Sequence, residues 1–476
     1  MSFSDGVTTI SFGAETTGHL LRQWTPEVPS LETTGSESSL EDGGETYAAS
    51  YRNPTETISV AWTGTLAQQR AALNTLNRLF QQARHRQRTG LGSRVYLLWE
   101  VTDDPGDYGA EGVYRSEVLS GRALVDDSLR AGLQVVGEQL LSEIVVTRRF
   151  FWEGEEEQIP LTNGNAEDDL AGLTVWNHDD ADAGHDNYVA IKAVDVLGDL
   201  PAPLRLKMEN TYDDDYSNRR LAFLWISHNV HSSPGSLGHI LEGEDCDVDE
   251  ENSTVADPDA SGGALQLCDW VGDAETEAYA WTLSSAVLAA CGGNYFKLLA
   301  LFGYGMDVRP IRFRWGLTYR GTTNEIWDSG AALPDQTVAT VVRDMATVQL
   351  PPWLVGGGSP APLTLRLWVQ RTGGGQLYLD FLQLSPVDNY CLLRYVSYGC
   401  AFGETLVFDG IEDQLYVETD EGEAAVFARY GSRAIMAWPG VEQRLYFLQH
   451  ATLVDTAEIE RTLSVTAWYR PRRLGL

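Results

Sequence analysis

VLGDLPAPLRLKMENT, residues Val196 to Thr211, has the composition of a rigid turn that leads into one amphipathic strand. Pro201 and Pro203 each fix a backbone φ angle and lack an N–H donor, which suits a position at the edge of a sheet. In LRLKMEN, which follows, apolar and polar side chains alternate, as in a strand with one buried face. The next residues are the acidic run NTYDDDYSNRR and not a hairpin turn. The partner strands must therefore come from elsewhere in the chain.

The length and charge of the whole chain limit what it can be. Its 476 residues, 43% of them hydrophobic, are too many for one hydrophobic core and predict about three domains. There are 68 acidic and 34 basic residues, which give a formal net charge of −34. Such a charge repels a phosphate backbone, so the surface as a whole is not expected to bind nucleic acid.

Neither targeting segments nor a disulfide framework is expected. SFSDGVTTISFG, after Met1, has no basic or apolar segment typical of a secretory signal, so we expect synthesis and folding in the cytoplasm. No apolar run approaches the ~18 residues of a membrane span. The five cysteines are widely spaced and form no CxxC pair, which favours buried free thiols over disulfides or a zinc site.

Residues 1–156 are predicted to form a first domain of strands with one long helix. The strand TISVAWTG leads directly into a helix predicted over residues 66–88. Thr65 and Gln68 have the spacing of a capping box, and Gly90 can end the helix. An apolar stripe at helical spacing predicts the buried face, which consists of Leu73, Leu76, Phe80 and Ala83.

From residue 157 onward the chain is predicted to be nearly all β. Short branched and aromatic runs such as NYVAIKAV, IRFRWGLTY and LYLDFLQL recur between clusters of Gly, Pro, Asn and Asp. Loop-like composition marks two candidate domain junctions, at His231–Pro258 and at Ser397–Glu404. The predicted fold class is mainly β, with several β-sandwiches in one chain.

The sequence offers no convincing catalytic set. It contains no nucleophile elbow, P-loop or HExxH motif. The acidic runs 213–215 and 245–251 could supply the carboxylate pair of a glycosidase, but carboxylates crowded in loops are usually solvated. We predict that the protein is not an enzyme.

One acidic loop, NHDDADAGHDN, has the spacing of a calcium-binding loop. Asp180, Asp182 and Asp186 are its candidate ligands. An EF-hand needs a glutamate where this chain has Ile191, so the motif is incomplete. A structural Ca²⁺ ion is one hypothesis for this loop and a solvated surface loop is the other. No other cofactor is predicted.

Six tryptophans lie between the two candidate junctions. They can either fill a sandwich core or stack on sugar rings at the surface, and core packing is favoured for any single one. Trp327 and Trp353 are the better candidates for glycan binding because they adjoin the turn signals WDSG and LPPW. The six residues are Trp270, Trp281, Trp315, Trp327, Trp353 and Trp368.

Three short motifs, in this order along the chain, resemble the distal tail protein (Dit) family of long-tailed bacteriophages, the siphoviruses. GDLPAP resembles the start of that family's second domain, AWPGVEQRLYFLQH resembles a late strand, and YRPRRLGL resembles the terminus. The first domain, with its strand followed by a helix, is similar as well. The matching residues are Gly198, Asp199, Pro201, Ala202, Pro203, Pro439, Gly440, Leu445, Phe447, Tyr469, Pro471, Arg472 and Leu474.

The resemblance implies an N-terminal β-sandwich with a helix that forms a hexameric ring, followed by a galectin-like sandwich. In a simple sandwich of roughly 100 residues, Pro203 and Pro439 would be much closer than the 236 positions found here. We therefore predict that residues 157–230 and 404–476 form one galectin-like sandwich. Residues 231–403 would be an inserted jelly roll, similar to a carbohydrate-binding module.

These observations lead to the hypothesis of a structural virion protein at the phage tail tip or baseplate. The expected partners are further copies in a hexameric ring, other tail proteins such as the tube, hub and fibres, and DNA as cargo passing through the lumen. A host-surface glycan is a further candidate partner. Two alternatives stay open, a tail tube protein with decoration domains and a glycan-binding adhesion protein.

Overall fold

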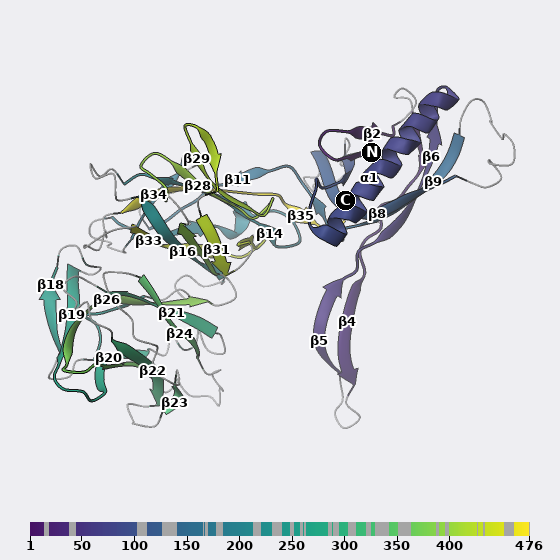
Figure 1. Cartoon of the computed structure of the whole chain (residues 1–476). Helices are drawn as coiled ribbons and strands as arrows, with labels where there is room; N and C mark the ends of the chain where they lie inside the picture. The colour runs from purple at the N-terminus through teal and green to yellow at the C-terminus, as the bar shows by residue number, and fades with distance from the viewer. Residues whose placement is uncertain are drawn as a thin grey trace. The chain divides into compact units, whose positions relative to one another are not determined.

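A computed structural model shows a mainly β protein, as predicted (Figure 1). The chain divides into two compact units. The first unit comprises Met1–Glu157, Leu197–Pro201 and Arg470–Leu476, and the second comprises Gln158–Val196 and Ala202–Tyr469. The structure describes residues 1–13, 19–37, 44–101, 112–125, 140–164, 166, 170–177, 184–212, 220–230, 240–247, 252–257, 260, 263–283, 288, 295–302, 311–319, 325–328, 342–350, 363–386, 390–395, 399–425, 427–431, 434–451 and 461–475.

The first unit is built on a nine-stranded antiparallel sheet. Seven strands follow the order β2–β1–β7–β8–β9–β6–β3, and the short strands β10 and β35 are attached at β8. The nine strands are β1 (Ser2–Ser4), β2 (Thr9–Ser11), β3 (His19–Gln23), β6 (Thr55–Trp62), β7 (Tyr96–Val101), β8 (Gly112–Val125), β9 (Leu140–Arg148), β10 (Trp152–Glu153) and β35 (Arg472–Arg473).

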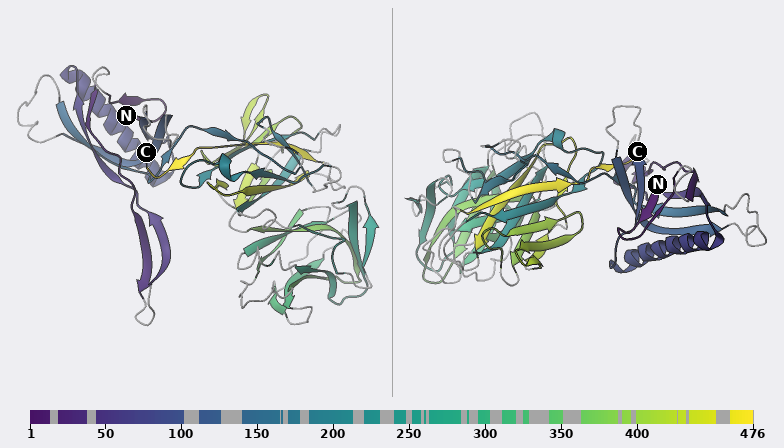
Figure 2. Two further views of the ribbon diagram at one scale, coloured as in Figure 1. Left: turned by 180° about the vertical axis from the view of Figure 1, so that it is seen from behind. Right: turned by 90° about the horizontal axis from the view of Figure 1, so that it is seen from above.

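Helix α1 (Leu66–Thr89) packs against this sheet, and its predicted caps are confirmed. Thr65 and Gln68 form the reciprocal capping box, and Gly90 ends the helix in the left-handed conformation. Leu76, Leu79, Phe80 and Ala83 are buried. A Cβ atom at Gly121 of β8 would lie 2.6 Å from the Phe80 ring, so this glycine allows the helix to approach the strand closely. Figure 2 shows α1 running across one face of the sheet.

Two further strands of the first unit form a hairpin of their own. β4 (Leu31–Glu37) and β5 (Gly44–Tyr51) make a separate two-stranded sheet, and among the described strands they pair only with each other. Figures 1 and 2 show them leading away from the nine-stranded sheet. We call this element the β4–β5 hairpin.

The second unit contains two β-sandwiches, and we call the first the split sandwich. Its seven-stranded sheet has the order β11–β34–β15–β28–β29–β30, with β12 beside β34, and its five-stranded sheet has the order β13–β33–β16–β27–β31. A small sheet pairs β14 with β32, and the 3₁₀ helix η1 is Ala193–Asp195. The strands are β11 (Glu157–Ile159), β12 (Leu173–Trp176), β13 (Tyr188–Ile191), β14 (Ala202–Pro203), β15 (Arg205–Asn210), β16 (Leu221–Val230), β27 (Tyr390–Tyr395), β28 (Thr405–Asp409), β29 (Gln414–Thr419), β30 (Gly422–Ala424), β31 (Phe427–Gly431), β32 (Met436–Ala437), β33 (Gln443–Ala451) and β34 (Thr462–Tyr469).

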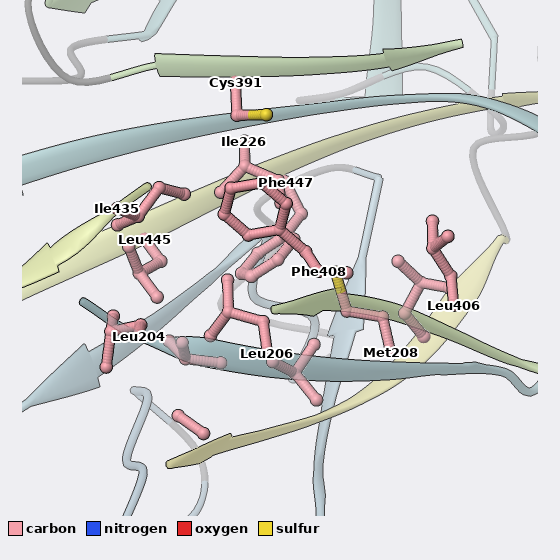
Figure 3. Packing of buried hydrophobic residues seen from close by; sticks show 14 of the residues in the cluster. Leu204, Leu206, Met208, Ile226, Cys391, Leu406, Phe408, Ile435, Leu445 and Phe447 are labelled. Carbon is pink, nitrogen blue, oxygen red and sulfur yellow. The ribbon is translucent and has the colours of Figure 1, made fainter. Parts of the chain in front are cut away.

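Strands from distant parts of the sequence share both sheets of the split sandwich. β15 pairs with β28 on one side and with β34 on the other, and β16 pairs with β33. Figure 3 shows Leu206 and Met208 of β15 facing Ile226 and Phe447 across the core. All four side chains are fully buried. The strand LRLKMEN therefore pairs with strands that lie more than 190 positions further along the chain. This agrees with the absence of a hairpin turn after it in the sequence.

One strand lies in a different sandwich from the one that the sequence indicated. Residues 390–395 fall within the range 231–403 that we assigned to the insertion, but they form β27, which pairs with β16 and β31 of the split sandwich. The alternation in YCLLRY predicts a strand with one buried face. It carries no information about which of two neighbouring sandwiches buries that face.

The inserted sandwich has a six-stranded and a four-stranded sheet. The first has the order β18–β19–β26–β21–β24 with β17 beside β26, and the second has the order β20–β25–β22–β23. The strands are β17 (Ile240–Glu242), β18 (Asn252–Ala256), β19 (Ala264–Trp270), β20 (Thr276–Leu283), β21 (Tyr295–Phe302), β22 (Arg312–Tyr319), β23 (Glu325–Asp328), β24 (Val342–Gln349), β25 (Leu363–Gln370) and β26 (Gly375–Pro386).

The six-stranded sheet contacts the split sandwich within the second unit. Trp225 packs with Leu299, Leu301 and Phe381 in one buried cluster, and its Nε1 donates to Ser385 Oγ at 3.3 Å. This contact covers part of the outer face of the six-stranded sheet.

Candidate functional site

Two of the three motifs that carry the family resemblance meet in the first unit. Gly198 and Leu200 form β-bridges with Arg472. The Asp199 amide donates to the Arg472 carbonyl at 2.7 Å, and the Leu474 amide donates to Asp199 Oδ2 at 2.9 Å. Residues that lie more than 270 positions apart in sequence thus form one structural feature, which we call the junction.

The backbone at the junction requires glycine at position 198. Gly198 has a φ of +109°, which L side chains rarely adopt. A Cβ atom there would also lie 2.6 Å from the Arg472 carbonyl oxygen. Any side chain would therefore separate the two segments.

Arg472 anchors the C-terminal segment through its side chain. Its Nη2 donates to Glu153 Oε1 at 2.9 Å, and its guanidinium lies 4.1 Å from the centroid of the Phe151 ring. Glu153 also pairs with Arg115 at 3.3 Å. Burial lowers the pKa of Arg472, and the charge of Glu153 opposes this shift. The junction is thus held by charge as well as by backbone pairing.

The structure divides the lead-in GDLPAP between the two units. The sequence predicts that this lead-in begins the second sandwich at the edge of a sheet. Leu197–Pro201 instead belongs to the first unit, and Ala202–Pro203 forms β14 of the split sandwich, paired with β32. The reason is that Gly198 and Asp199 use their backbone groups on Arg472. A pattern of prolines cannot reveal this partner.

A second, buried ion pair lies at the base of the β4–β5 hairpin. Arg148 is fully buried, and its Nη2 donates to Glu56 Oε1 at 2.7 Å. Glu56 also accepts from Trp24 Nε1 at 2.8 Å and from the Glu27 amide at 2.9 Å. Burial lowers the pKa of Arg148, and the carboxylate of Glu56 opposes this shift. The pair links the residues before β4 to the strand after β5.

The predicted glycan-binding residues remain predictions. The backbone of Trp327 lies in β23, but its side chain falls outside the described residues, as does Trp353 entirely. Trp270, Trp281 and Trp315 are buried in the core of the inserted sandwich. For these three, the favoured interpretation as core residues is confirmed.

Trp368, which the sequence analysis did not select, lies on the outer face of the four-stranded sheet. It is half-buried, and the Arg314 guanidinium lies 3.8 Å from its ring centroid. Arg314 in turn pairs with Glu275 through two hydrogen bonds of 2.8 and 2.9 Å. Beside it, Arg366 pairs with Glu277. The alternation in LTLRLWVQ already places Trp368 on the face opposite the buried leucines and could have identified it.

The predicted calcium loop is only partly described. Asp180 and Asp182 lie outside the described residues. Asp186 is buried, and its carbonyl accepts from the Trp176 amide at 2.8 Å. The described residues contain no group of three or more His, Cys, Asp or Glu side chains placed to hold a metal ion. A bound Ca²⁺ stays a prediction.

A hollow of about 800 Å³ lies on the split sandwich. Carboxylates dominate its charge, with Glu404, Glu418, Asp420 and Glu421 in the lining and Arg220 as the single basic residue among the described lining residues. No histidine, cysteine or serine is among the lining residues that the structure describes.

The described thiols have the environment of packing residues. Burial raises the pKa of Cys246, Cys391 and Cys400 to about 12 in each case. They are therefore protonated at neutral pH, and a protonated thiol is a poor nucleophile.

Among the described residues, no helix combines the length and apolar character needed to cross a membrane.

Comparisons with known proteins give only distant likenesses. No protein-family model and no curated protein matches the chain. Among solved structures it is similar to the Dit protein (gp 19.1) of phage SPP1, with 10% identity over 76% of this chain and 92% of that chain and a TM-score of 0.25. It is similar to the phage P2 baseplate in its activated conformation with Ca, with 8% identity over 100% and 99% of the two chains and a TM-score of 0.30.

A third likeness is to an enzyme, an exo-β-1,3-galactanase from Phanerochaete chrysosporium solved with galactose. The identity is 10% over 61% of this chain and 78% of that chain, with a TM-score of 0.21. At such TM-scores, none of these likenesses by itself establishes a common fold or a function.

Proposed function

We propose that the chain is a structural protein of a bacteriophage tail tip, which forms a ring between the tail tube and the tip or fibre complex. The observation that carries the proposal is the junction. Short motifs have little specificity on their own, but here residues of two motifs, Gly198, Asp199, Arg472 and Leu474, contact one another directly. Residues of two of the three motifs that carry the family resemblance thus lie in one structural feature, which supports the proposal.

Ring formation is supported by the β4–β5 hairpin. A two-stranded hairpin alone is marginally stable in water, and sheets usually need a third strand or another packed element. The described strands of this chain supply no such third strand. We expect a neighbouring copy in a ring to pack against the hairpin.

The net charge of −34 suits a ring with a DNA-conducting lumen. A negative wall repels the phosphate backbone, so that DNA can pass without being bound. In this proposal DNA is cargo and not a ligand, and the ring is expected to be six-fold.

Immunogold labelling of intact phage particles with an antibody against this chain tests its place in the tail. We expect label at one end of each tail, and about six copies per particle by quantitative mass spectrometry if one six-fold closed ring is present. Label along the whole tail, with a copy number many times larger, would instead identify a tail tube protein. Absence of the chain from purified particles would contradict both assignments.

Glycan binding by the inserted sandwich is a second candidate function, and Trp368 favours it. An aromatic ring flanked by fixed polar groups is the usual chemistry of a sugar-binding surface. Here the Arg314 guanidinium lies over one face of the Trp368 ring, and Arg314 is held in place by Glu275. The planar guanidinium and the carboxylate offer donors and acceptors to sugar hydroxyl groups.

The substitution Trp368→Ala tests this second function. We expect it to weaken binding of the full chain on a glycan array by ~10-fold or more, because truncating a central aromatic contact typically costs over 1 kcal/mol. The matched control is Trp438→Ala, which removes a tryptophan that is 40% exposed on the split sandwich. Equal binding by the two variants, or no glycan binding by the unsubstituted chain, would contradict a role for Trp368.

A further inference from the structure

One edge strand of the inserted sandwich lacks the usual protection against pairing with another chain. Among the described strands, β18, β24, β20 and β23 lie at the ends of its two sheets. A register shift interrupts the pairing of β24, β20 and β23, and in each case the extra residue lies in the edge strand. Such bulges twist an edge away from foreign strands. By contrast, β18 pairs with β19 in unbroken register along its whole length.

The side chains of β18 do not block this edge either. Its residues, NSTVA, include no charged residue and no proline, and residues 253–256 are exposed. Natural edge strands are commonly blocked by lysine, by proline or by inward-pointing charges. Figure 1 shows β18 at the margin of its sheet, and no described strand lies beyond it. It is thus a regular, uncharged edge.

The hydrogen-bond pattern shows which backbone groups of β18 are turned outward. The Asp257 amide donates to the Gly263 carbonyl at 3.1 Å, and this pair continues the register of β18 with β19. In an antiparallel ladder, the backbone groups of successive residues alternate between the two sides of a strand. The N–H and C=O groups of Thr254 and Ala256 are therefore directed away from β19.

Two side-chain hydrogen bonds hold β18 in place. Asn252 Nδ2 donates to the carbonyl of Ala278 in the four-stranded sheet at 2.7 Å. Thr254 Oγ1 donates to Gln266 Oε1 of β19 at 3.0 Å. The edge is therefore pre-organised, so β18 loses little conformational freedom when a further strand pairs with it.

We propose that β18 is the docking site for an extended segment of another protein of the particle, which adds a strand to the six-stranded sheet. That this partner belongs to a phage particle rests on the proposed function. Charge defines its chemistry, because Asp249, Glu250 and Glu251 precede β18 in the sequence and Asp257 and Asp259 follow it. The segment is expected to have uncharged β-branched residues with lysine or arginine on both sides.

The β18 strand of a second copy is the other strand that could pair with this edge. In an antiparallel pair of two copies, the acidic flank of one strand would meet the acidic flank of the other. Like charges placed opposite each other destabilise a strand pair. The flanking charges therefore favour a different, basic partner.

Peptide binding to the purified full-length chain tests the proposal. The probe is a short fluorescent peptide of alternating threonine and valine with lysines at both ends, followed by fluorescence anisotropy. Ala256→Pro removes an outward N–H and is expected to weaken binding by ~10-fold or more, because proline cannot donate to the added strand. The matched control, Ala256→Thr, keeps this N–H and is expected to bind like the unsubstituted chain.

The outcomes of the peptide experiment are distinct. Hydrogen exchange in β19 and β26 checks that both variants keep the inserted sandwich folded. Equal binding by Ala256→Pro and Ala256→Thr, or no binding by the unsubstituted chain, would overturn the proposal. A peptide with glutamates in place of the lysines is expected to bind more weakly, and equal binding would contradict the proposed basic partner.

Cross-linking in assembled phage particles identifies the partner. A photo-crosslinking amino acid replaces Ser253, which is exposed, and we expect a cross-link to a different tail protein. Cross-links only to other copies of this chain, or to no protein, would overturn the proposed partner. Peptide binding does not require a ring. If the chain is absent from particles but Ala256→Pro still loses the peptide, the proposed function is wrong and the docking edge stands.

Discussion

Replacing Glu56 by glutamine is expected to lower the free energy of unfolding of the first unit by about 3–5 kcal/mol. The substitution keeps the shape of the side chain but removes the charge opposite Arg148, which is fully buried. An uncompensated buried guanidinium is costly because the interior cannot solvate it. The loss appears as faster hydrogen exchange in peptides from β6 and β9, measured by mass spectrometry on the full chain.

Two variants separate the buried ion pair from general effects of charge. Glu56→Gln/Arg148→Met removes both charges and is expected to recover part of the stability lost in the single variant. Glu32→Gln removes one partner of the exposed pair with Arg52 and is expected to cost less than about 1 kcal/mol. If Glu56→Gln lowers the free energy of unfolding no more than Glu32→Gln does, the buried pair does not stabilise the base of the hairpin.

Phe447→Ala is expected to destabilise the split sandwich by about 3–5 kcal/mol, the usual cost of deleting a buried aromatic ring. Phe447 is fully buried in β33, and its ring faces side chains of strands from before the insertion, such as Leu206 and Ile226 (Figure 3). Because the two halves share one core, β15 and β16 should lose protection from hydrogen exchange together with β28, β33 and β34.

Glu209→Ala is the matched control, since Glu209 is the exposed residue of β15. We expect this substitution to have little effect on hydrogen exchange in these strands. The core strands of the inserted sandwich are expected to keep their protection in both variants, because they pack around a separate core. Loss of protection confined to the strands after the insertion would show that the two halves fold independently.

Local chemistry made parts of the first unit predictable from sequence. The caps of α1 depend on Thr65, Gln68 and Gly90, each within four residues of a helix end, and all three act as predicted. The mainly β class followed from period-two alternation, which the structure bears out in strands such as β15 and β34. Both kinds of signal lie within one segment of the chain.

Features that depend on distant partners were not predictable. The local alternation of apolar and polar residues does not reveal that Gly198 pairs with Arg472. It also does not reveal that β27 belongs to the split sandwich. Trp368 differs, since its strand pattern places it on the outer face. Turn signals beside a tryptophan are thus a poorer guide to its exposure than the periodicity of its strand.

Electron microscopy of the purified full-length chain in negative stain tests the central claim most directly. We expect closed rings of uniform size with six-fold averages and a stain-filled lumen. A homogeneous population of monomers at high concentration, which forms no ring with any other tail protein, would contradict the account.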